Sequence, residues 1–121
     1  MPDLPTRRFG RTELPIPLLS LGGMRFQQSW TDLPASEITS DSQSNLQATL
    51  QRATQLGLHH VETARHYGSS ERQLGWAIPT TPDSKRILQS KVPPREDPHA
   101  FEAELALSFC LLYTSPSPRD L

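Results

Sequence analysis

Three short apolar runs, separated by longer polar stretches, predict three β-strands. The first run, Leu18 to Leu21, ends at Gly22-Gly23, which predicts a buried strand followed by a glycine turn. Leu58 to Glu62 predicts the second strand. The third is predicted over Arg86 to Val92 (RILQSKV), where the pattern alternates until Pro93-Pro94 stops it. All three candidate strands are short.

The segment before the second strand has the spacing of an amphipathic helix. Ser44 and Gln47 fit a capping box, and three apolar residues that follow share one helical face: Leu46, Leu50 and Ala53. Gly57 fits the C-terminal cap. Residues 27 to 43, which precede this helix, are predicted to form an irregular loop.

Two further helices have clear start signals. Ser70 and Gln73 again fit a capping box and predict a brief helix that ends before Pro79. Asp97 as N-cap, with Pro98 at the first helical position, predicts a third helix. The apolar face of this third helix consists of Phe101, Leu105 and Phe109.

Ahead of these elements, Arg8-Phe9 and Leu14 to Pro17 flank Gly10-Arg11-Thr12 as the two arms of a predicted hairpin. The order is therefore hairpin, strand, helix, strand, helix, strand, helix, which is typical of an α/β fold with parallel strands. Parallel sheets need both faces covered, and three strands with three helices cannot close a barrel. The chain is either a small open sheet or the first part of a larger fold.

Composition and charge exclude several classes of function. The 121-residue chain has a net charge of −1 with both signs scattered, so neither a nucleic-acid-binding stripe nor an acidic tail is present. Its apolar runs are too short for a membrane span or a signal peptide, which predicts a soluble cytoplasmic protein. One cysteine, Cys110, and four histidines without ligand spacing predict no metal site. The oligomeric state stays open.

The segment Cys110 to Asp120 (CLLYTSPSPRD) departs from the pattern of the rest of the chain. Its polar part, Thr114 to Pro118, breaks the helix that contains Phe101. The segment resembles a translated sequencing-library transposase adapter. This resemblance predicts that residues 110–121 are a non-native tail and that the authentic protein sequence stops near Phe109. A natural Ser/Pro-rich tail is the alternative.

Three chemically active side chains follow the predicted strands. Glu62 ends the second strand, Tyr67 lies in the next loop and Lys91 lies at the end of the third. In a β/α barrel such groups gather on one rim. A phenol, with a pKa of about 10, is a poor acid at neutral pH, but a nearby ammonium favours the phenolate and a carboxylate keeps that ammonium charged. The trio is suited to donate a proton to a carbonyl oxygen.

Each of these residues also has a purely structural interpretation. Taken alone, Tyr67 would pack at the rim, Lys91 would be a solvated strand end and Gly22-Gly23 a tight turn. Trp30 and Trp76 are either core or substrate-wall residues. Charged residues near the loop are interpreted as solvated loop positions or as the N-terminus and exposed face of the next helix: Arg65, His66, Glu71 and Arg72.

Three ordered motifs, RRFGRTELPIPLLSLGGMRF, VETARHYGSSERQLG and ILQSKVPP, resemble the N-terminal third of an aldo/keto reductase over residues 7 to 109. The resemblance implies the first part of a (β/α)8 TIM barrel whose N-terminal hairpin closes the bottom. It also implies hydride transfer from NADPH to a small-molecule aldehyde or ketone, or the reverse reaction. Residues 1–109 would then be a partial oxidoreductase domain.

The family's Asp-Tyr-Lys-His tetrad maps onto this sequence in part. The resemblance assigns Tyr67 as proton donor, Lys91 as the residue that lowers the tyrosine pKa, and Glu62 to the aspartate position. Glu62 is one methylene longer than aspartate, so its geometry with Lys91 must differ. The loop beside the nicotinamide ring corresponds to Gly22, Gly23 and Met24.

The remaining parts of the family's site have no counterpart in this chain. The tetrad histidine and most NADPH contacts belong to later loops, and some related members add a C-terminal iron–sulfur region. The 121-residue chain is therefore expected to show no reductase activity by itself. Two alternatives remain: a non-catalytic binding or regulatory protein on the same fold, or a fragment whose uncovered strand edges and helix faces prevent stable folding.

Overall fold

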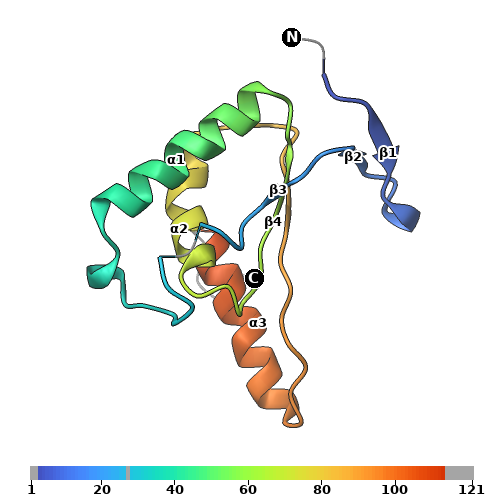
Figure 1. Ribbon diagram of the computed structural model, residues 1–121. Coiled ribbons are helices and arrows are strands. Elements are labelled where there is room, and N and C mark those ends of the chain that lie inside the picture. The colour runs from blue at the N-terminus through green and yellow to red at the C-terminus, as the bar shows by residue number, and fades with distance from the viewer. Residues whose placement is uncertain (1–2, 27, 114–121) are drawn as a thin grey trace.

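The computed structural model describes residues 3–26 and 28–113. A hairpin is followed by three helices that alternate with the strands of a parallel sheet (Figure 1). The elements are, in order, β1 (Thr6–Arg8), β2 (Pro15–Pro17), β3 (Leu21–Gly22), α1 (Ser40–Gln55), β4 (His60–Glu62), α2 (Ser70–Ala77), β5 (Ile87–Gln89) and α3 (Pro98–Leu112). Short 3-10 turns occupy Gly10–Thr12, Ala35–Glu37 and Ile78–Thr80. The order predicted from the sequence is confirmed.

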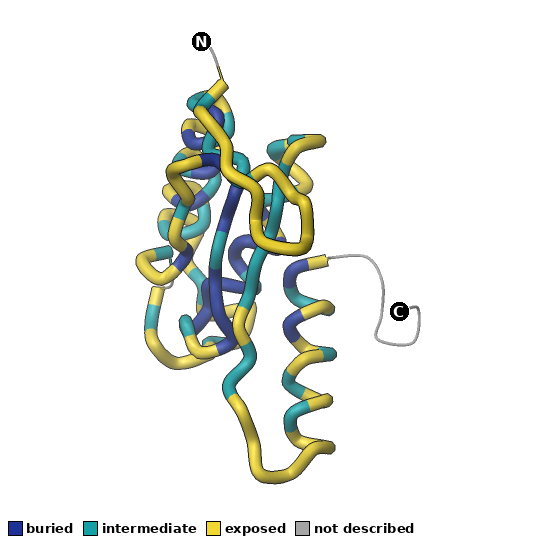
Figure 2. Tube along the Cα trace, turned by 90° about the vertical axis from the view of Figure 1, so that its right-hand side faces the viewer, coloured by how far each residue is buried: buried dark blue, intermediate teal, exposed yellow. Residues whose placement is uncertain are grey.

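The hairpin lies apart from the helices. Its strands pair antiparallel with Thr6 opposite Pro17, and the 3-10 turn between them begins at Gly10, whose φ of +55° suits a residue without a side chain. The predicted hairpin is therefore correct, although its first arm is Thr6–Arg8 and not Arg8-Phe9. Most of the hairpin is exposed (Figure 2).

The sheet has the order β3-β4-β5, with all neighbours parallel. Each strand is shorter than predicted because regular pairing covers only two or three residues. The interpretation of Leu18 to Leu21 as one buried strand is wrong in its first half. Leu18 and Leu19 are 54% and 58% exposed, because the chain there still leads out of the hairpin.

The strand register separates the two faces of the sheet. Leu21, Val61 and Leu88 lie side by side, and they belong to or pack against the core. Because side chains alternate along a strand, Glu62 and its partner Gln89 face the other way. The helices supply the rest of the buried apolar cluster: Leu46, Leu50, Leu74, Ala77 and Leu112.

Helix α1 begins earlier than the capping-box pattern predicted. Thr39 is its N-cap, and the hydroxyl of Thr39 accepts a hydrogen bond from the backbone N–H of Ser42 at 3.2 Å. Ser44 lies exposed inside the helix, so the predicted loop over 27–43 is wrong at its end. The predicted C-terminus holds, since Gly57 follows the last turn with φ +84°.

Helix α2 packs between α1 and α3. Its N-cap is Ser69 and its first helical residue is Ser70, and it ends before Pro79 as predicted. The expected cap at Ser70 is wrong, because its hydroxyl bonds to other elements. In the middle of α2, a Cβ at Gly75 would lie 1.7 Å from the carbonyl oxygen of Leu111, so the α2 and α3 backbones touch there.

Helix α3 has the predicted start, with the Asp97 carboxylate accepting from the His99 backbone N–H at 3.0 Å. It continues to Leu112, which is 6% exposed and part of the core. The first residues of the adapter-like segment are thus helical and packed. The rest of that segment, residues 114–121, lies outside the described residues.

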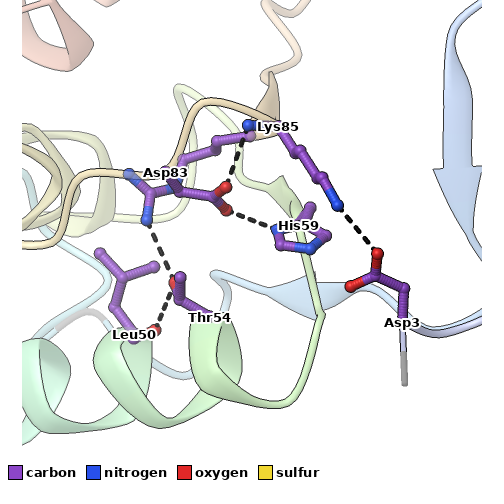
Figure 3. Close-up of polar contacts among 7 residues, drawn as sticks. Asp3, Leu50, Thr54, His59, Asp83 and Lys85 are labelled. Carbon is purple, nitrogen blue, oxygen red and sulfur yellow. Dashed lines mark hydrogen bonds and ion pairs between the residues drawn. The ribbon is translucent and has the colours of Figure 1, made fainter. Parts of the chain in front are cut away.

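Polar contacts join the elements at the amino-terminal end of β4 and β5 (Figure 3). His59 Nδ1 lies 2.7 Å from Asp83 Oδ2, and Lys85 Nζ donates to Asp3 Oδ2 at 2.8 Å. The hydrogen bond and charge of Asp3 raise the pKa of Lys85 above its usual value. This end of the sheet is opposite to the strand ends where Glu62 and Lys91 lie.

Candidate functional site

The carboxyl ends of β4 and β5 bring Glu62, Tyr67 and Lys91 together. Glu62 is the last residue of β4 and pairs in register with Gln89 of β5, so Lys91 follows on the same side of the sheet. The Lys91 ammonium forms an ion pair with the Glu62 carboxylate, and its Nζ lies 4.9 Å from the centroid of the Tyr67 ring. The predicted trio is therefore one spatial cluster, and its longer glutamate reaches the lysine.

Two opposing effects act on the Lys91 ammonium. Burial lowers its pKa, but the interactions with Glu62 and Tyr67 outweigh burial and hold the pKa of Lys91 above its ordinary value of 10.5. The Lys91 side chain is 47% exposed, so solvent screens the ion pair and its contribution to stability is small. At neutral pH the cluster thus contains a fixed cation beside a phenol.

Backbone hydrogen bonds hold the loop that carries Tyr67 against β5. The Thr63 N–H donates to the Gln89 carbonyl at 2.8 Å, and the Arg65 N–H donates to the Lys91 carbonyl at 2.9 Å. The chain then turns back at Tyr67, whose N–H donates to the Ala64 carbonyl at 3.1 Å. These bonds extend the register of β4 and β5 beyond the strands and so fix where the phenol projects.

Gly68 completes this turn under two constraints. Its φ is +52°, and a Cβ at this position would lie 1.7 Å from the carbonyl oxygen of Ser29. Only glycine fits such a close approach of two loops. Gly68 therefore holds the loop after β4 against the loop after β3.

Gly22 ends β3, and Gly23 and Met24 begin the loop that follows; these are the three residues predicted to lie beside a cofactor. The Gly23 N–H donates to the Glu62 carbonyl at 2.7 Å, and a Cβ on Gly23 would lie 2.8 Å from that same oxygen. Ser70 Oγ donates to the Gly23 carbonyl at 2.9 Å. Packing against β4 and α2 therefore already requires glycine at position 23. Gly22 and the partly exposed Met24 lie on either side of this contact.

Sequence reasoning missed a buried charged pair behind the site. Arg65 and Glu71 were interpreted as a solvated loop residue and a helix-terminus residue, but they are 6% and 0% exposed. Arg65 Nη1 lies 2.8 Å from Glu71 Oε1, outside hydrogen-bond geometry, and Arg65 Nη2 donates to Asp32 Oδ2 at 2.7 Å. In the sequence, only the opposite charges of Arg65 and Glu71 on either side of Tyr67 could have indicated that the two residues pair.

The two tryptophans are not core residues. Trp30 is 63% exposed and meets the ring of Tyr67 edge-on, with centroids 6.5 Å apart. Trp76 is 37% exposed on α2. Trp30 therefore lies beside the cluster, as one of the two predicted alternatives requires.

Most of the chain, including this cluster, matches a known protein family. Residues 18–107 match the model of the aldo/keto reductase family, which covers most of the chain. The chain belongs to the aldo/keto reductase family. Its matched region includes the three strand ends and all the residues of the cluster. Comparison with curated proteins gives no match.

Two solved structures assigned as aldo-keto reductases from Pseudomonas aeruginosa resemble the whole arrangement. The first has a TM-score of 0.67 and 25% identity, and the second a TM-score of 0.66 and 24% identity. Each alignment covers 95% of this chain but only 47% and 45% of the solved chains. The chain therefore corresponds to an incomplete TIM barrel, as the sequence predicted, and spans about half the length of these proteins.

The described residues, 3–26 and 28–113, contain neither a candidate membrane span nor a candidate metal site. None of their helices is long and apolar enough to cross a membrane. Among these same residues, no three His, Cys, Asp or Glu side chains are grouped so that they could hold a metal ion.

Proposed function

We propose that this chain is part of an NADPH-dependent oxidoreductase that reduces the carbonyl group of a small aldehyde or ketone. One observation carries the proposal: a phenol, an ammonium and a carboxylate meet at the carboxyl ends of neighbouring strands, with Lys91 between Glu62 and Tyr67. The family is one of oxidoreductases, which supports the reaction class.

The chemistry follows from the charges in the cluster. Of the three side chains, the phenol of Tyr67 is the uncharged O–H donor, so we assign it as the proton donor to the carbonyl oxygen. Lys91 stabilises the negative charge that develops on the phenolic oxygen when the proton leaves. Glu62 orients the ammonium and keeps it charged, which the raised pKa of Lys91 reflects.

We place the nicotinamide at the end of β3 and the start of the loop that follows it. Gly22 is exposed and has no side chain, and the exposed Met24 offers an apolar surface, so this place suits a flat ring, whereas Gly23 is buried beneath it. Bound NADPH would supply the hydride that complements the proton from Tyr67. Packing alone already requires glycine at position 23, so a substitution there would not test nicotinamide binding. Substitutions at Gly22 and Met24 test it better.

The protein made from the complete reading frame of the gene tests the proposal. NADPH oxidation would be followed with a panel of aldehydes and ketones. Tyr67→Phe and Lys91→Met should each lower kcat at least tenfold, in line with the about 10²–10⁴-fold contribution of general acids. Lys85→Met is the matched control, because Lys85 lies at the opposite end of the strands.

Two results of this assay would decide against the proposal. Turnover that survives in Tyr67→Phe would refute the proton-donor role. NADPH binding without turnover on any carbonyl would favour a regulatory protein on the same fold. The 121-residue chain alone is expected to give no turnover, because it covers about half of the solved chains it resembles.

A further inference from the structure

We propose that Arg65 and Glu71 are positioning residues that set the placement of Lys91 against Tyr67, an inference that rests on the proposed function. Both side chains are buried, and neither belongs to the proton-donating trio. Together with Ser90 they form a polar connection between the Tyr67 loop, the start of α2 and the end of β5.

Arg65 is the centre of this connection on the loop side. Its two terminal nitrogens reach different carboxylates, Glu71 in α2 at 2.8 Å and Asp32 in the loop after β3 at 2.7 Å. A planar guanidinium can bridge two directions at once, whereas a lysine ammonium offers a single point charge. Arg65 thus ties the Tyr67 loop to two other parts of the chain.

Glu71 continues the connection to β5. Its second oxygen accepts a hydrogen bond from Ser90 Oγ at 2.8 Å, and Ser90 directly precedes Lys91. A backbone hydrogen bond adds a second connection between the two segments, because the Arg65 N–H donates to the Lys91 carbonyl at 2.9 Å. Side chains and backbone therefore bind Lys91 to the loop from two sides.

The burial of Arg65 and Glu71 indicates that the direction of their hydrogen bonds is important for the position of the Tyr67 loop. Removing two charges from water is costly, and well-packed apolar residues are often as stabilising as a buried ion pair. Hydrogen bonds to Ser90 and Asp32 have defined directions, which apolar contacts lack. A loop that must hold a phenol at a fixed distance from an ammonium needs such directed contacts.

The composition of the chain provides a direct test, because Lys85 and Lys91 are its only lysines. A trace acylating reagent reacts with the neutral amine, so the acylation rate of each lysine, measured by peptide mass spectrometry, reports its free-amine fraction. Lys85, held by Asp3 far from the loop, is the internal standard. The measured quantity is the Lys91-to-Lys85 acylation ratio in the 121-residue chain.

Four variants give the expected pattern. Ser90→Ala and Arg65→Lys keep every charge, so a rise in the ratio must come from displacement of Lys91 and loss of its contact with Glu62. We expect about a threefold rise, equivalent to half a pKa unit. Glu71→Gln should give at least as large a rise, and Ser90→Thr, which retains the hydroxyl, should restore the wild-type ratio.

Glu104→Gln is the control for loss of a nearby ion pair. It removes the ion pair between Glu104 of α3 and Arg95, which precedes α3, and should leave the ratio unchanged. If Glu71→Gln unfolds the chain, both lysines become equally reactive, and the charge-preserving variants Ser90→Ala and Arg65→Lys decide. An unchanged ratio in Ser90→Ala and Arg65→Lys, with wild-type circular dichroism, would overturn the inference. Because the measurement does not use turnover, an inactive enzyme would refute only the proposed function.

Discussion

Lys91 holds its ammonium 4.9 Å from the centre of the Tyr67 ring while the same ammonium pairs with Glu62. The two residues come from different segments, and the arrangement depends on the pairing of β4 with β5 and on the turn at Gly68. The cluster is therefore set by the fold at the carboxyl ends of β4 and β5. Its geometry can be tested without any assay of activity.

The first prediction concerns the titration of this lysine. In a chain with labelled lysines, side-chain NMR should give Lys91 a pKa above 10.5, and Glu62→Gln should lower it. Because the folded-state pKa is raised, the stabilisation from the pair is fully present below pH 10.5 and is lost as the pH rises through the folded value. Lys85 should keep its own titration in Glu62→Gln. A Lys91 pKa unaffected by that change would show that the pair does not form in solution.

The second prediction tests the contact between α2 and α3. Gly75→Ala should destabilise the chain by about 1–3 kcal/mol, because the new Cβ would overlap the Leu111 carbonyl and force the helices apart. Urea denaturation measures the change. Ser44→Ala, at an exposed position of α1, is the control. A stabilised Gly75→Ala variant would show that the α2 and α3 backbones do not touch at this position.

The third prediction decides which residue caps α1. Thr39→Ala should cost about 1 kcal/mol, because it removes the acceptor for the Ser42 N–H. Ser44→Ala should be neutral or slightly stabilising, because alanine favours helix interiors. The difference between the two free energies of unfolding is the measurement. A larger loss of stability in Ser44→Ala than in Thr39→Ala would support the capping box predicted at Ser44 and Gln47.

The fourth prediction concerns the end of α3. Leu112→Ala should lower the free energy of unfolding by about 2–5 kcal/mol, because Leu112 is buried in the core. Leu107→Ala, at a position 41% exposed, should cost much less. Thermal or urea denaturation of the two variants gives the comparison. Equal costs would show that the adapter-like segment does not pack onto the sheet.

Local signals were sufficient for most of the fold. Periodicity and proline placement gave the α/β order, and the Asp97-Pro98 start and Gly57 end of helices were correct because they depend on backbone groups a few residues away. The trio Glu62, Tyr67 and Lys91 could be grouped from sequence since parallel strands end at the same edge.

Where capping rules failed, tertiary contacts had taken over the side chain. Ser70 fits a capping box, but its hydroxyl bonds to Thr63 and to the Gly23 carbonyl instead, joining α2 to the loops after β4 and β3. Thr39 has no Glu or Gln three residues later, so the pattern favoured Ser44. A motif records what a side chain can bond to, and its neighbours in space determine which bond forms.

The sequence by itself determined the order of elements, the family resemblance and the three residues of the cluster. Tertiary structure alone decided that Arg65 and Glu71 are buried and that Gly75 meets Leu111. The reason is physical: helix and strand patterns arise from neighbours along the chain, whereas burial of a charge depends on partners brought in by the fold. Arg65 is stable inside only because Asp32 and Glu71 arrive from two other segments.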